Sequence, residues 1–150
     1  MRNVKRYVIP TLFVLVVAGM GTLFTNSGME WFDTLKRPSE WLPDFVIPIV
    51  WTIIYLSFWI FTITNDYYLY PRLTNLLVIN GFVNVLWCLI YFVINSLLGG
   101  LIVIVVNLVT SILLLIEISK YYKTWSMFLL IYPTWLLIAT TLNLTIFVLN

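Results

Sequence analysis

The chain has 150 residues, of which 62% are hydrophobic and only 9% are charged, and its formal net charge is +2. Soluble domains normally carry roughly a quarter charged residues, so this composition excludes a chain surrounded by water, and the scattered basic residues exclude a nucleic-acid-binding surface. With one cysteine, Cys88, and no histidine, the chain cannot form an internal disulfide, a Cys/His zinc site or a histidine-based catalytic centre, so we predict no metal and no cofactor.

Five apolar runs predict five transmembrane helices, over residues 7–24, 46–64, 73–93, 97–118 and 125–149. Each run has about 18 to 25 residues, and a helix needs about 20 to cross the hydrocarbon core of a bilayer. The runs are continuously apolar rather than alternating, which disfavours a β-barrel. The basic residues before the first run also fit a signal peptide, but that run is long enough to span. We therefore predict an all-α fold, with residues 1–150 forming a single transmembrane domain.

The loop over residues 25–45 is rich in aromatic residues and carries four of the six acidic residues. Two readings fit this composition: an aromatic belt at the membrane interface, or an ordered lid folded over one end of the bundle. We favour the lid, because a solvated linker needs no tryptophans and because its prolines would stiffen it. The lid residues we single out are Trp31, Lys36, Arg37, Pro38, Trp41 and Pro43.

Aromatic and polar side chains lie inside the later runs. Trp51, Tyr55 and Trp59 recur every fourth residue and form one helical stripe. In the third run Asn80 and Asn84 share a face, which Trp87 and Tyr91 nearly extend, and further polar or aromatic positions are Asn107, Trp135 and Asn143. Hydrogen bonds between helices and ordinary core packing explain any one of these residues. An aromatic-lined cavity for a flat apolar ligand explains them together.

The turn between the third and fourth runs is short, and Asn95 and Ser96 supply the break. The charges at the ends of the runs predict the orientation. Six of the eight basic residues fall on one side of the predicted membrane, namely Arg2, Lys5, Arg6, Arg72, Lys120 and Lys123. Basic residues favour cytoplasmic loops, so we expect a cytoplasmic N-terminus and an outward C-terminus. This bias fits a bacterial plasma membrane.

Three motifs, spread over nearly the whole chain, are specific when taken together. The loop and second run carry Trp31-Phe32, Leu35, Arg37-Pro38, Trp41, Pro43, Val50-Trp51-Thr52 and Tyr55; the third carries Asn84, Trp87, Tyr91 and Phe92; the fifth carries Ala139, Thr140, Leu142 and Asn143. The chain thereby resembles the translocator protein family, also called tryptophan-rich sensory proteins or peripheral-type benzodiazepine receptors. It departs from the family's pattern at Trp41, which is shifted by one residue, at Leu42, which replaces a proline, and at Pro133, which lies closer to Trp135.

The resemblance implies a five-helix bundle in the lipid bilayer, often a homodimer, with a pocket under the first loop. It implies binding of protoporphyrin IX and of synthetic isoquinoline carboxamide and benzodiazepine-type ligands. Some bacterial members promote light-dependent porphyrin breakdown, which makes Trp51 and Trp135 the candidate photochemical residues. With Tyr55 and Tyr91 added from the stripes above, the expected ligand-binding residues are Trp51, Tyr55, Asn84, Trp87, Tyr91, Trp135, Ala139, Leu142 and Asn143.

Three functions stay open at this point. The first is a receptor or sensor for tetrapyrroles, whose carboxylates would meet Lys36, Arg37 and indole N–H groups. The second is a transporter of porphyrins or other lipophilic molecules, although the chain has no clear internal repeat. The third is a membrane scaffold, which needs no aromatic pocket. No paired carboxylates or phosphate-binding loop indicates ordinary catalysis.

Overall fold

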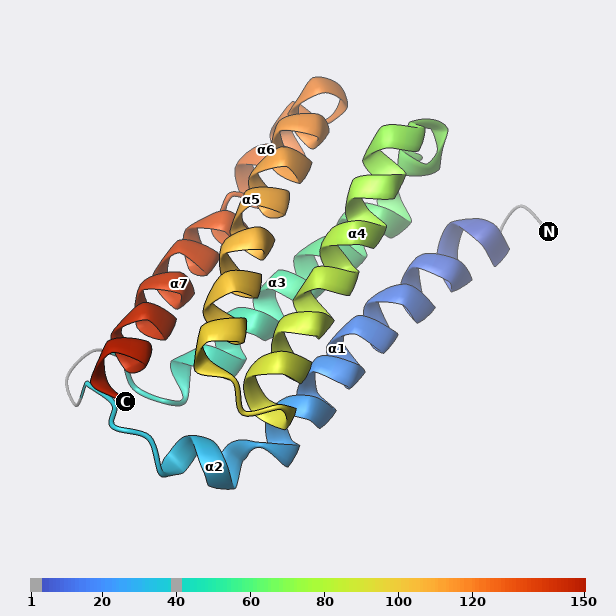
Figure 1. Ribbon diagram of the computed structural model, residues 1–150. Coiled ribbons are helices and arrows are strands. Elements are labelled where there is room, and N and C mark those ends of the chain that lie inside the picture. The colour runs from blue at the N-terminus through green and yellow to red at the C-terminus, as the bar shows by residue number, and fades with distance from the viewer. Residues whose placement is uncertain (1–3, 39–41) are drawn as a thin grey trace.

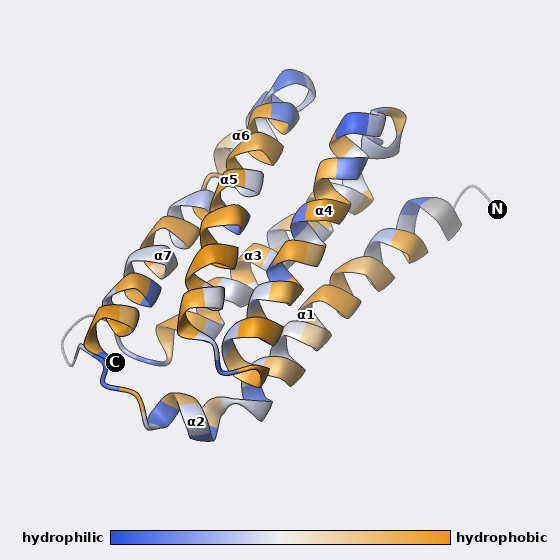
Figure 2. Cartoon of the chain, in the orientation of Figure 1, coloured by the Kyte–Doolittle hydropathy of each residue, from blue (hydrophilic) through white to orange (hydrophobic). Residues whose placement is uncertain are grey.

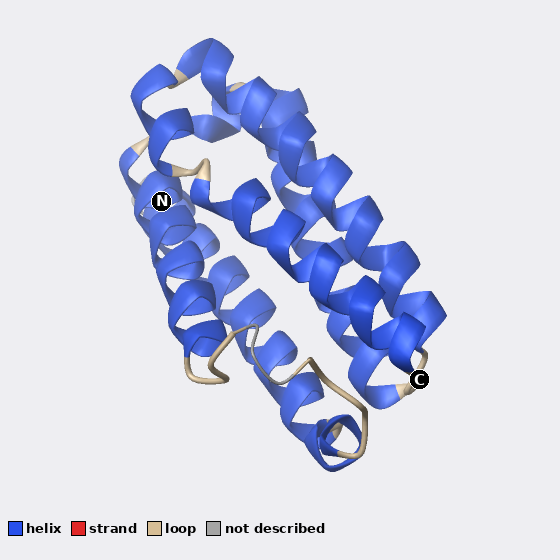
Figure 3. Cartoon of the chain, turned by 90° about the vertical axis from the view of Figure 1, so that its left-hand side faces the viewer, coloured by secondary structure: helices blue, strands red, loops and turns tan. Residues whose placement is uncertain are grey.

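The computed structural model describes residues 4–38 and 42–150, and these residues form helices joined by short loops, without a β-strand (Figure 3). Five helical stretches in the described part are long and apolar enough to cross a membrane: Arg6–Ser27, Val46–Thr64, Pro71–Val93, Leu97–Tyr121 and Lys123–Leu149. The all-α bundle of five helices expected from the sequence is therefore confirmed.

The individual elements follow the chain in a simple order. The first span is α1 (Ile9–Ser27), entered through a π-helical turn (Val4–Val8); the short α2 (Met29–Asp33) follows it, and then α3 (Val46–Thr64). A 3₁₀ turn (Tyr67–Leu69) leads to α4 (Pro71–Cys88), which a π-helical turn (Leu89–Val93) extends. The last three helices are α5 (Leu97–Tyr121), α6 (Lys123–Phe128) and α7 (Ile131–Leu149).

Local chemistry explains where the helices break. Asn95 has a φ of 58°, a left-handed conformation that asparagine tolerates better than most residues. The side chain of Ser96 then caps α5 by accepting a hydrogen bond from the N–H of Gly99 at 3.1 Å. The fifth span was expected as one helix from residue 125, but it is divided into α6 and α7. Pro133, which has no N–H to donate, lies in the first turn of α7, where a helix tolerates it.

The outer surface of the bundle is apolar along its length. Leu15, Phe82, Ile102 and Val148 are 56–74% exposed, and Figure 2 shows hydrophobic residues along the long helices and hydrophilic ones mainly towards their ends. Exposure of such large apolar side chains is unfavourable in water but favourable in contact with lipid tails. The surface is therefore that of a protein embedded in a membrane.

The two ends of the bundle differ. α2 lies across the end at which α7 finishes, and the start of α1 lies at the opposite end (Figure 1). We call these the loop end and the closed end. Buried residues gather in two clusters. The first lies beneath the loop, and its members include Trp87, Tyr91 and Trp135. The second is formed by Phe61, Leu73, Leu77, Leu114, Ile118 and Leu129.

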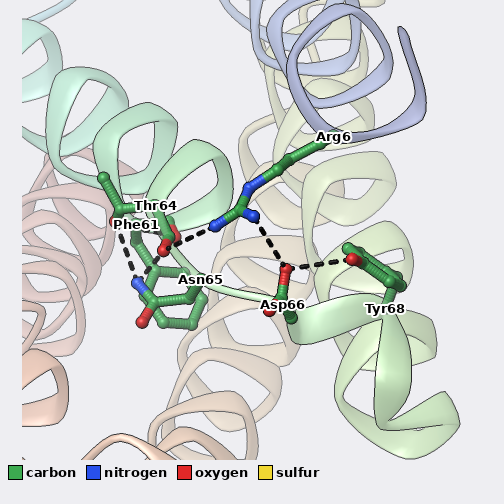
Figure 4. Close-up of polar contacts among 6 residues, drawn as sticks. All are labelled: Arg6, Phe61, Thr64, Asn65, Asp66 and Tyr68. Atoms are coloured by element: carbon green, nitrogen blue, oxygen red, sulfur yellow. Dashed lines mark hydrogen bonds and ion pairs between the residues drawn. The ribbon is translucent and has the colours of Figure 1, made fainter. Parts of the chain in front are cut away.

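Polar contacts tie the helices together at the closed end. The Arg6 guanidinium lies 3.6 Å from Asp66 and donates to the carbonyl of Thr64 at 3.5 Å, while the hydroxyl of Tyr68 donates to Asp66 (Figure 4). These contacts join the first span to the connection between α3 and α4. Near the end of α5, the buried carboxylate of Glu117 pairs with Lys120 at 2.7 Å and with Arg72 at 3.4 Å.

Candidate ligand-binding site

A cavity of about 800 Å³ lies inside the bundle and reaches the loop end. Its walls come from α1, α2, α3, α7 and the last turns of the third span, and most of the lining is apolar. The aromatic lining residues are Phe32, Trp51, Tyr55, Trp59, Trp87, Tyr91, Phe92 and Trp135. Cavities of roughly 300–1,000 Å³ with apolar walls and a few polar groups are typical of small-molecule sites.

Four of these rings form a nearly parallel row. The centroids of Tyr55 and Trp51 are 5.6 Å apart, those of Trp51 and Trp87 6.5 Å, and those of Trp87 and Tyr91 5.7 Å. The planes of neighbouring rings differ by only 24–26°. The four rings therefore stack on one another in a row, in which Trp87 and Tyr91 are buried and Trp51 and Tyr55 keep exposed surface for stacking with a flat ligand.

A hydrogen-bond network of asparagines stands behind this wall. Asn84 donates to the hydroxyl of Tyr55 at 2.9 Å and accepts from the side chain of Asn107 at 3.1 Å. The oxygen of Asn107 accepts from Asn80 at 3.0 Å and from the hydroxyl of Tyr132 at 3.1 Å. Four spans meet in this network, which explains how these polar side chains are accommodated inside the bundle and how Tyr55 is fixed.

A second polar contact fixes Trp87. Its indole N–H donates to the side-chain oxygen of Asn143 at 3.3 Å, and the amide of Asn143 donates to the carbonyl of Ala139 at 2.8 Å. The indole of Trp87 is thereby linked to α7. Tyr91 and Trp135 also line the cavity, and their buried polar atoms, the hydroxyl of Tyr91 and the indole N–H of Trp135, have no hydrogen-bond partner among the described residues.

The chain turns sharply from α1 into α2 to cover the loop end. Gly28 stands at this turn, where a side chain would collide with the carbonyl of Phe92. α2 then sets Trp31 edge-on against Tyr91 at 5.7 Å, and Phe32 against Phe92 at 5.6 Å. Contact of these rings with the bundle is what a lid requires.

The rest of the loop is held by polar contacts. The N–H and carbonyl of Lys36 both bond to the side chain of Asn150, at 3.0 and 3.1 Å. The guanidinium of Arg37 lies 3.4 Å from both Asp33 and Asp44 and 4.9 Å from the ring centroid of Phe32. Arg37 and Asp44 also line the cavity, so a cation and an anion face its outer part.

The structure brings most of the predicted site residues to one cavity. Eight of them line it: Trp51, Tyr55, Trp87, Tyr91, Trp135, Ala139, Leu142 and Asn143. Asn84 is buried behind the wall and acts on the cavity only through Tyr55. Among the lid residues, Arg37 lines the cavity, Pro38 and Pro43 line a smaller hollow beside it, and Trp31 covers Tyr91. Trp41 lies outside the described residues.

Sequence reasoning missed the wall contributed by α1. This helix presents Thr11, Ala18, Gly21, Thr22 and Thr25 to the cavity. Their helical spacing and small size are a readable signal, since small residues on one face leave room for a neighbour or a ligand. Cys88 also lines the cavity. Within the described part of the chain, no three His, Cys, Asp or Glu residues are grouped to hold a metal ion.

Five apolar spans and an aromatic cavity define the class: an integral membrane protein with a candidate ligand site inside its helix bundle. The model of the TspO/MBR family matches residues 10–149, and the chain therefore belongs to that family, as its motifs indicated.

Two curated relatives carry the name Tryptophan-rich protein TspO. The chain is 27% identical to the one from Archaeoglobus fulgidus, with 99% of each chain covered. It is 29% identical to the one from Chlorobaculum tepidum, over 91% of this chain and 90% of the relative. A third relative, Protein CrtK of Rhodobacter capsulatus, is 26% identical over 87% of this chain and 83% of its own length. These similarities cover the elements that form the cavity.

Proposed function

We propose that the protein is a membrane receptor or sensor that binds tetrapyrroles such as protoporphyrin IX in the cavity. Membership of the TspO/MBR family supports a tetrapyrrole-related role in general. The observation that carries the proposal is the row of nearly parallel rings formed by Tyr55, Trp51, Trp87 and Tyr91. Trp51 and Tyr55 keep exposed surface at this row, and a large flat macrocycle gains more from stacking there than a compact or flexible ligand does.

The remaining features of the cavity fit the same ligand class. Its volume of about 800 Å³ accommodates a macrocycle, and its outer part contains Arg37, which is paired with Asp33 and Asp44. A tetrapyrrole bound with its ring between the spans would direct its carboxylates towards this polar end. Isoquinoline carboxamide and benzodiazepine-type ligands, which are also flat and aromatic, would compete for the same wall.

Trp51 and Trp135 are our candidates for a photochemical role. Both line the cavity, so both could contact a bound ring, and an indole can give an electron to a photoexcited porphyrin without any acid or base. In this proposal the double variant Trp51→Phe plus Trp135→Phe would lose light-dependent porphyrin breakdown.

Titration of the purified protein with protoporphyrin IX tests the proposal. We expect quenching of tryptophan fluorescence in the wild type, and binding weakened by about tenfold in Trp51→Phe plus Trp135→Phe. Trp125→Phe is the matched control, because Trp125 packs on Phe61 at the closed end. Unchanged binding in the double variant would exclude stacking on this wall. Light-independent, vectorial uptake by proteoliposomes would instead favour a transporter.

The membrane orientation and oligomeric state belong to the same proposal. In this proposal the closed end lies in the cytoplasm of a bacterium and the loop end outside, as the charge bias supports, so the ligand would meet the lid from the outer face. A homodimer rests on the family resemblance. Labelling of single cysteines introduced at each end tests the orientation, and cross-linking in intact membranes tests the dimer.

A further inference from the structure

Of the three buried, unpaired donors among the described residues, two belong to residues that line this cavity, and the third is the Arg6 Nε at the closed end. The side chains of Tyr91 and Trp135 are only 1% and 6% exposed, yet the Tyr91 hydroxyl and the Trp135 indole N–H have no partner among the described residues. Buried polar groups are nearly always hydrogen-bonded. The polar tips of Tyr55, Trp59 and Trp87, which line the same cavity, are all paired within the protein. The unpaired donors therefore point to a ligand that brings its own acceptors.

The two donors lie at different depths. Tyr91 is two residues from Val93, at the loop end of its span. Trp135 is 14 residues before Leu149, where α7 reaches the loop end, which corresponds to about 20 Å of helix. One small acceptor group cannot serve both donors, so each must be considered separately. Tyr91 is the one near the polar mouth of the cavity.

Tyr91 and Arg37 border the same part of the cavity. The ring of Phe32 lies 6.1 Å from the ring of Tyr91 and 4.9 Å from the guanidinium carbon of Arg37. Both residues pack against Phe32, so a cation and an unused hydroxyl donor lie around one ring, which is a suitable environment for a carboxylate. Arg37 is the one positively charged side chain among the described residues that line the cavity.

Arg37 alone would recognise a carboxylate poorly, because Asp33 and Asp44 already engage its guanidinium at 3.4 Å each. Its charge is therefore largely compensated before a ligand arrives. The hydroxyl of Tyr91 has no such competitor among the described residues. Its O–H can therefore donate to a carboxylate oxygen of a ligand.

We propose that the Tyr91 hydroxyl donates a hydrogen bond to a carboxylate oxygen of the bound tetrapyrrole at the loop end, and thereby selects macrocycles that carry carboxylates over those that lack them. This inference rests on the proposed tetrapyrrole function and adds a specificity-determining residue to it. The ring of Tyr91 is the last of the row of stacked rings, and its hydroxyl supplies the polar contact.

The test compares two porphyrins that differ in their carboxylates. Protoporphyrin IX carries two, and etioporphyrin carries none on a similar macrocycle. We expect Tyr91→Phe to weaken binding of protoporphyrin IX by about tenfold, as loss of a hydrogen bond to a charged group does, and to leave etioporphyrin binding within about twofold. Tyr121→Phe is the matched control, since this tyrosine stacks on Tyr70 at the closed end.

A second measurement separates recognition from packing. Tyr91→Phe keeps the ring that packs against Gly100 and removes only a buried, unpaired donor. The ligand-free variant should therefore unfold at the same or a higher temperature than the wild type. A lower unfolding temperature, with both porphyrins weakened alike, would mean that the hydroxyl supports the fold, and would overturn the inference.

The remaining outcomes distinguish the two proposals. If the wild type binds both porphyrins and Tyr91→Phe changes neither affinity, the role of the hydroxyl is wrong and tetrapyrrole binding stands. If the wild type binds neither porphyrin, the proposed function fails and this inference fails with it.

Discussion

At the closed end of the bundle, Phe61, Leu73 and Ile118 have no exposed surface, and their side chains fill the space between four spans. At the loop end, α1, α2, α3, α7 and the last turns of the third span surround a cavity of about 800 Å³. Trp51 and Tyr55, which face that cavity from α3, are only half-buried. α3 thus contributes a filled core at one end and a cavity wall at the other.

The contrast shows how a small bundle can hold a ligand and still be stable. The closed end is stabilised by packing and by ion pairs between helices, such as Arg72 with Glu117. The loop end is less tightly packed, because the helices there line the cavity. The hydroxyl of Tyr55 on the cavity wall is fixed by the hydrogen-bond network around Asn84 and Asn107. The network lies near the middle of α4 and α5, between the filled cluster and the row of aromatic rings.

The largest expected loss of stability comes from a substitution in the filled core of the closed end. Leu73→Ala should lower the free energy of unfolding by about 3 kcal/mol or more, because it opens a hole in a closed core. The matched change at the loop end is Leu142→Ala, where the side chain already borders open space, and it should cost only about 1 kcal/mol. Reversible unfolding in mixed micelles measures both. Equal losses would show that the two ends are packed alike.

A smaller effect is expected in the hydrogen-bond network around Asn107. Asn107→Ala removes the group that joins Asn80, Asn84 and Tyr132, and should lower the free energy of unfolding by about 1–2 kcal/mol. Its combination with Tyr132→Phe should cost less than the sum of the two single changes, because one hydrogen bond is shared. Strictly additive losses in this double-mutant cycle would contradict the network.

The sequence predicts the spans well because the bilayer imposes a length and an apolar composition that the chain must display. The turn at Asn95 and Ser96 was also readable, since few other residues favour that backbone. The division of the fifth span into α6 and α7 was not predicted, although Pro133 lies close to the break. Where a helix adjusts to a proline depends on which neighbouring side chains it packs against, and the chain alone does not give that.

For the candidate site too, the features of a single helix could be predicted, and the features that depend on neighbouring helices could not. The aromatic stripe on α3 and the position of Trp87 could be predicted, because large rings at helical spacing are visible in one helix at a time. The wall from α1 was missed, since Ala18 and Gly21 matter only through what lies opposite them. The unpaired hydroxyl of Tyr91 could not be predicted either, because it depends on the absence of an acceptor from every helix around it.

The smallest expected effect concerns the hydrogen bond between the two helices that flank the cavity. The indole N–H of Trp59 on α3 donates to the hydroxyl of Thr11 on α1 at 2.9 Å, and both residues line the cavity. Trp59→Phe should lower the free energy of unfolding by about 0.5–1 kcal/mol, the usual size for a bond between membrane helices. Thr11→Val removes the acceptor as well as the bond from Thr11 to the carbonyl of Tyr7, so it should cost slightly more. Adding Trp59→Phe to Thr11→Val should then cost less than Trp59→Phe costs alone, because the shared bond is already lost. If the two losses add in full, the bond does not hold α1 against α3, and the cavity wall depends on apolar contacts alone.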